Sequence, residues 1–183
     1  MIYPHLDLRL VSLIAGLWLI LSHGYALVFP APVQRWLKSF PRSKPAGTVF
    51  LIVDAVWALI LVATMDLGEF SHMRHIILIV IVVATVLTLR YVEEFLAVRA
   101  LGILLLLVAE PMIEAAFLKP QTGRLLLVAL AYVIAVLGMT WVGLPYVMRD
   151  QIAKARASRA LWTAAALAGV LYGGALAVFA AIG

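Results

Sequence analysis

The chain contains no cysteine among its 183 residues. This absence excludes disulfide bonds, thiolate nucleophiles, cysteine-bound zinc and iron–sulfur clusters. Charged side chains are also scarce: they make up 13% of the chain, whereas soluble globular proteins carry roughly a quarter. Because 66% of the residues are hydrophobic, the composition predicts an integral membrane protein in which residues 1–183 form a single membrane domain.

Familiar catalytic motifs are missing as well. The sequence has no Ser–His–Asp arrangement, no phosphate-binding glycine-rich loop and no HExxH motif. The segments between its apolar runs are too short for a catalytic domain. A non-enzymatic role without a cofactor is therefore favoured, although an enzyme that acts on lipid with carboxylates and histidines stays an alternative.

Six apolar segments have the length of about 17 to 25 residues that a membrane-spanning helix needs. They predict an all-α, polytopic membrane helical bundle whose first span is retained, because that segment is longer than a signal peptide. The third segment has a short apolar core and could instead form a re-entrant or strongly tilted helix. The predicted helices cover residues 8–30, 48–66, 75–92, 97–118, 123–147 and 159–182.

A proline-rich linker, APVQRWLKSFPRSKPAG, occupies residues 31–47. Its VQRWLKSF portion could form a short interfacial helix with Trp36 toward the acyl chains and Lys38 toward the lipid headgroups. A solvated basic loop is the alternative.

The basic residues predict the orientation of the chain. If the linker is cytoplasmic, ten of the fourteen Lys and Arg residues lie on that side, and both termini face away from the cytoplasm of the cell (inner) membrane. The net charge of +5 is then explained by contacts with the lipid bilayer rather than with nucleic acid. The ten residues are Arg35, Lys38, Arg42, Lys44, Arg90, Arg99, Arg149, Lys154, Arg156 and Arg159, and the other four are Arg9, Arg74, Lys119 and Arg124.

The two halves of the chain could be related by an inverted repeat. Residues 47–68 can be laid beside residues 123–143, with glycine at both ends and an aromatic residue near the middle. Three spans in each half would then have opposite orientations, as in 3+3 inverted-repeat transporters.

Ionisable side chains within the predicted spans are the main candidates for function, since a charge near the bilayer centre costs several kcal/mol unless it is paired, neutral or facing protein. His23 and Asp54 both lie roughly 10 Å inside the predicted cytoplasmic boundary, from about 1.5 Å of rise per residue. Neighbouring spans could pair them as a proton relay. A structural hydrogen bond that locks the two helices together is the alternative.

Glu110 and Glu114 lie one helical turn apart, on the same face of the fourth span. Two ionised carboxylates at this spacing repel each other, so in a low-dielectric setting at least one is expected to be protonated. Pro111 cannot donate a backbone hydrogen bond, which frees the carbonyl near Leu107 as a possible polar partner. The pair predicts a proton or cation site, unless Glu114 reaches water or pairs with Lys119 or Arg124.

Three further patterns are weaker indications of function or structure. His72 and His75, beside Asp66 and Glu69, could share a metal ion, but unliganded interfacial histidines are common. His23 could be a lone axial ligand of a haem or pigment shared with a partner. The stretch RYVEEFLAVR at 90–99 predicts a self-neutralising charged turn.

The last span carries small residues and has no acidic or basic side chain after Arg159. Ala165, Gly169 and Gly173 are spaced by four residues, a pattern that allows close helix packing within the bundle or between subunits. Two functions follow as hypotheses. The chain is a small transporter or channel with translocation linked to the buried carboxylates and a homo-oligomeric state, or it is an accessory subunit of a larger respiratory or pigment complex.

Overall fold

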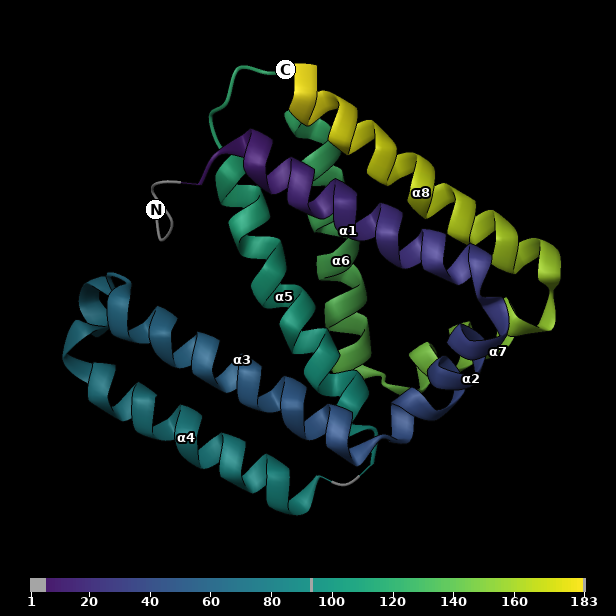
Figure 1. Ribbon diagram of the computed structural model, residues 1–183. Coiled ribbons are helices and arrows are strands. Elements are labelled where there is room, and N and C mark those ends of the chain that lie inside the picture. Colours follow the sequence, from purple (N-terminus) through teal and green to yellow (C-terminus); the bar gives the residue numbers. More distant parts are fainter. Residues whose placement is uncertain (1–5, 93, 183) are drawn as a thin grey trace.

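The computed structural model describes residues 6–92 and 94–182, and these residues form helices and short links without strands (Figure 1). Six helical segments are long and apolar enough to cross a membrane. The prediction of an all-α membrane bundle is thus confirmed. The elements are α1 (Leu8–Val28), α2 (Pro30–Ser39), the 3-10 turn η1 (Phe40–Arg42), α3 (Lys44–Thr64), the 3-10 segment η2 (Gly68–Met73), α4 (Arg74–Tyr91), α5 (Leu96–Ala116), α6 (Arg124–Gly143), α7 (Tyr146–Ala157) and α8 (Arg159–Ile182).

The long helices pack as three neighbouring pairs. Helix α1 lies against α8 along one edge, α3 lies against α4 along the other, and α5 and α6 cross between them (Figure 1). Helix α5 is central because it also packs against α3 and α1. Nine residues of α5 are buried, whereas α4 has no buried residue, so α4 presents apolar side chains outward around most of its circumference.

The short helices α2 and α7 pack together at one end of the bundle, beside the link from α4 to α5 (Figure 1). We call this end the α2–α7 end. The start of α1, the end of α8 and the links 65–73 and 117–123 lie at the opposite end (Figure 1).

Paired glycines let two of the helix pairs approach at the level of the backbone. A Cβ atom on Gly173 of α8 would lie 2.6 Å from the carbonyl oxygen of Gly16 on α1, and a Cβ on Gly16 would lie 2.7 Å from the carbonyl oxygen of Gly173. Gly102 of α5 and Gly138 of α6 form an equivalent crossing, with corresponding distances of 2.8 and 2.7 Å. Such close approach is how small residues promote helix association in membranes.

Three polar side chains tie helices together through backbone carbonyls. Trp162 Nε1 donates a hydrogen bond to the carbonyl oxygen of Ala26 (3.1 Å), and Arg99 Nη1 donates one to that of Val142 (3.0 Å). Both acceptors lie in the last turn of a helix, where carbonyls lack an intrahelical donor and attract positive charge. Tyr172 Oη donates similarly from α8 to the carbonyl oxygen of Leu126 (2.7 Å) on α6.

The linker forms the helical alternative that the sequence left open, and the third span is a continuous helix. The short helix predicted within 33–40 is present as α2, and α4 is a continuous helix of 18 residues. In the 90–99 stretch, the Arg99 guanidinium donates a hydrogen bond to a carbonyl oxygen at the end of α6. Glu93, another member of the predicted charged turn, lies outside the described residues.

The fifth span is shorter than predicted. Helix α6 ends at Gly143, and a separate helix α7 follows from Tyr146. Pro145 explains the break, because proline disfavours helical geometry in the residue before it, and Leu144 accordingly has φ −128° and ψ 68°. Most of α7 lies between the predicted spans, in a polar segment for which the sequence predicts no helix.

The order of the short helices differs between the two halves of the chain. Helix α2 follows the first span of the first half, whereas α7 follows the second span of the second half. The 3+3 inverted repeat therefore stays a prediction to which the element order adds no support.

We expect the α1–α8 crossing to be sensitive to a single methyl group. Gly173→Ala should lower the thermal unfolding midpoint in detergent, because the new Cβ meets backbone atoms that cannot rotate away, and such overpacking costs about 1–3 kcal/mol. The matched control is Gly174→Ala, where a Cβ has no neighbour within 4 Å and alanine favours the helix by up to about 1 kcal/mol. Equal midpoints for the two variants would contradict the crossing.

Candidate functional site

The two glutamates of α5 line a groove on the outer surface of the bundle. The groove has a volume of about 520 Å³ and is bordered by α5 side chains and by Ala135 of α6. Glu110 and Glu114 lie on the opposite side of α5 from Met112 and Ala115, given a rotation of about 100° per residue. Met112 and Ala115 pack into the buried core, so the glutamates face away from it.

The Glu110 and Glu114 carboxyl groups lie one helical turn apart on the lining of this groove, close enough to interact. A hydrogen bond between two carboxyl groups requires a proton on one of them. The Oε2 atom of Glu110 is buried and has no hydrogen-bond partner among the described residues. The pair predicted from the sequence is therefore brought together in a geometry that can hold a proton.

Asp54 is the most buried carboxylate of the described chain. It lies on α3, its side of the helix packs toward α5, and its residue exposure is 3%. Neither carboxylate oxygen has a hydrogen-bond partner within the described residues. A buried polar group without such a partner costs roughly 1–3 kcal/mol, so the Asp54 side chain is expected to lower the free energy of unfolding.

The three carboxyl groups lie at successive depths in the bundle. Helices α3 and α5 both run away from the α2–α7 end (Figure 1), and a Cβ on Gly47 would lie 2.7 Å from the backbone nitrogen of Ala97. Asp54 follows Gly47 by seven residues and Glu110 follows Ala97 by thirteen. The six-residue difference corresponds to about 9 Å along the helices at 1.5 Å per residue, with Asp54 nearer the α2–α7 end.

His23 belongs to a different interface. Its Nδ1 atom is 3.0 Å from the carbonyl oxygen of Leu19 and 3.2 Å from Ser22 Oγ. The imidazole lies over Gly169 of α8, where a Cβ would overlap the ring. The imidazole thus fills space between α1 and α8, while its Nδ1 atom contacts polar groups of α1.

The predicted pairing of His23 with Asp54 is not formed, as the unpartnered oxygens of Asp54 show for the described chain. Consecutive spans were expected to lie together. Instead, α2 and η1 separate α1 from α3, and these two spans pack against α8 and α5, respectively.

The remaining predicted residues are dispersed. His72 and His75 are exposed, and no group of three or more potential metal ligands occurs in the part of the chain that the structure describes. Gly169 and Gly173 contact α1 within the same chain, whereas Ala165 is exposed.

The sequence reasoning missed the partner of the small-residue face of α8. Ser12 and Gly16 of α1 are both buried, and Gly16 forms the crossing with Gly173. Their spacing of four residues is the same signal that identified Gly169 and Gly173, so the pattern could have been found in the first span as well.

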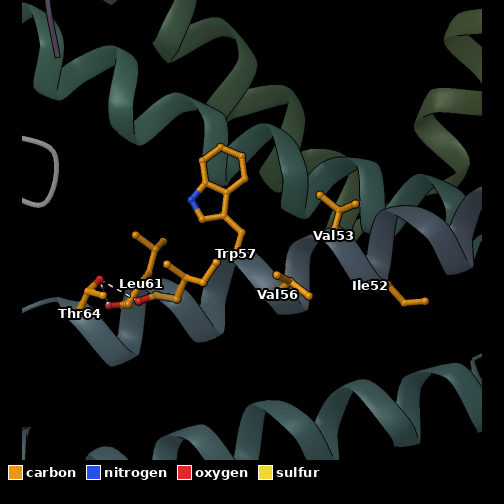
Figure 2. A pocket seen from close by; sticks show the side chains of 7 residues that line it. Ile52, Val53, Val56, Trp57, Leu61 and Thr64 are labelled. Carbon is orange, nitrogen blue, oxygen red and sulfur yellow. Dashed lines mark hydrogen bonds between the residues drawn. The ribbon is translucent and has the colours of Figure 1, made fainter.

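A second groove, on α3, contains no comparable chemistry. Its lining is apolar except for Thr64, whose Oγ1 donates a hydrogen bond to the carbonyl oxygen of Ile60 (2.8 Å) in the same helix. Figure 2 shows Trp57 projecting from α3 on the side away from α4. This groove suits acyl chains rather than a polar substrate.

No known protein family, curated protein or solved structure shows significant similarity to the chain.

Replacement of Asp54 tests whether its burial costs stability. Asp54→Val should raise the thermal unfolding midpoint in detergent, because it removes an unpartnered polar group worth roughly 1–3 kcal/mol. Asp54→Asn, which keeps the shape and polarity, should change the midpoint less. A lower midpoint for Asp54→Val would mean that the carboxyl group stabilises the α3–α5 interface.

Proposed function

We propose that this multi-pass membrane protein is a small transporter or channel in which translocation of protons or cations is linked to Glu110, Glu114 and Asp54. The observation that carries the proposal is the contact between the two glutamates in the groove on α5. A carboxyl pair that shares a proton can release it and take it up again, which is the elementary step of a relay.

Asp54 supplies a second station on the way to the α2–α7 end. Its carboxylate is buried without a hydrogen-bond partner among the described residues, although apolar side chains dominate the surrounding helix. Retaining such a group at a stability cost is typical of ionisable residues that act in ion or proton pathways. The stations are offset by about 9 Å along the helices, so passage of a proton between them requires an intervening water molecule or a movement of the helices.

The groove opens on the outer surface, so a second copy of the chain would enclose the pathway. We infer a homo-oligomer for this reason. We also infer that the α2–α7 end faces the cytoplasm, because ten of the fourteen Lys and Arg residues belong to the segments at that end.

A proteoliposome assay tests the role of Glu110. Vesicles that contain the protein and an internal pH-sensitive dye should show proton uptake driven by an imposed pH gradient and a counter-ion leak. Glu110→Gln should reduce the uptake to that of empty vesicles, because the amide cannot exchange the proton.

The matched control for this assay is Glu69→Gln, which removes an exposed carboxylate of η2 outside the groove and should transport like the natural protein. Undiminished uptake by Glu110→Gln would remove Glu110 from the mechanism.

A second candidate function is that of an accessory subunit in a larger membrane complex. The exposure of α4 favours it, since none of its residues is buried in the described chain. Extraction in a mild detergent distinguishes the two functions. The accessory role predicts stoichiometric co-purification with other subunits, whereas the transporter predicts particles of this chain alone.

A further inference from the structure

A basic cleft lies between α2 and α7, about 280 Å³ in volume and outside the carboxyl site. Lys38 of α2 and Arg42 of η1 line one side, and Arg149 and Arg156 of α7 line the other. These residues are far apart in the sequence and meet only because α2 and α7 pack together.

The cleft has an excess of positive charge. Arg149 also forms an ion pair with Asp150 (2.9 Å), with both side chains about half exposed, so part of its charge is compensated. The described lining residues include no carboxylate. The Nε atom of Arg156 is buried and lacks a hydrogen-bond acceptor among the described residues.

Guanidinium and ammonium groups together favour a phosphate. Guanidinium groups bind phosphate oxygens in a bidentate manner, and lysine contributes a point charge. Lys38 and Arg42 also line a second hollow on the outer side of α2, together with Arg35. The cations therefore extend beyond the cleft along the surface that would meet the headgroup layer.

The apolar part of the lining distinguishes a lipid from a free ion. Phe95 and Ile152 line the same cleft and pack against the buried cluster formed by Phe40, Ala97, Val98 and Met148. Trp36, whose ring centroid lies 5.0 Å from that of Phe40, is 58% exposed. A soluble phosphate would leave these apolar surfaces in contact with water, whereas an acyl chain would cover them.

We propose that the cleft between α2 and α7 binds the phosphate-bearing headgroup of an anionic phospholipid, with an acyl chain against Phe95 and Ile152. The site is independent of the proposed transport function. It would hold the α2–α7 end at the membrane surface, because the lipid bridges two helices that belong to opposite ends of the sequence.

Native mass spectrometry of the protein in a neutral detergent tests this proposal. Phosphatidylglycerol should bind saturably at one site per chain and more tightly than phosphatidylcholine. The triple variant Lys38→Gln, Arg42→Gln, Arg156→Gln should weaken this binding by about a hundredfold, since each cation near an anionic headgroup contributes roughly fivefold.

The matched control is Arg90→Gln, Lys154→Gln, Arg159→Gln, which removes the same charges from exposed positions outside the cleft. It should bind phosphatidylglycerol like the natural protein. Equal losses in both triple variants would overturn the site in favour of a diffuse charge effect.

A double variant and a competition with inorganic phosphate provide two further tests. If the triple variant does not fold, Lys38→Gln, Arg42→Gln removes only exposed side chains and should weaken binding by about twenty-fivefold on the same basis. Inorganic phosphate should not compete with the lipid at millimolar concentration. Full displacement of the lipid by phosphate would assign the cleft to a soluble phosphate ligand and overturn the lipid assignment.

Discussion

Close backbone contact between helices is the constraint on which the arrangement of this protein depends. Lipid tails are as apolar as leucine, so apolar surface alone does not drive helices together within a bilayer. Gly16 with Gly173, and Gly102 with Gly138, remove the side chains that would keep two helix pairs apart. These crossings determine which face of each helix is buried, and hence where every polar side chain on that helix is placed.

The location of the carboxyl groups follows from this packing. Helix α5 uses Gly102 against α6, Ala97 against α3, and Met112 with Ala115 in the core that includes α1. On the described part of α5, the side that carries Glu110 and Glu114 includes the exposed Ile113. The glutamates therefore border an outer groove. Asp54, by contrast, lies within the α3–α5 contact and is buried there.

The polar ends of the bundle are organised by a different rule. Short helices with basic residues lie where the chain leaves the apolar region, and their carbonyl-rich helix ends attract cations. Arg99 satisfies the end of α6, while Lys38, Arg42 and Arg156 gather in the cleft between α2 and α7. One end of the bundle is thereby suited to anionic headgroups, and the carboxyl groups are kept inside the membrane region, well separated from those cations.

The sequence by itself determined the class of the protein, the number of spans, and the helix that appears as α2, because hydrophobic runs and their breaks are local properties. It also placed Glu110 and Glu114 on one face, since four residues return a helix to the same side. Only the tertiary structure decided which way that face points, that His23 packs over Gly169 instead of reaching Asp54, and that α7 brings Arg149 and Arg156 beside α2. Local periodicity specifies positions around one helix axis, but the choice of neighbour depends on the fit between two surfaces that are distant in the chain.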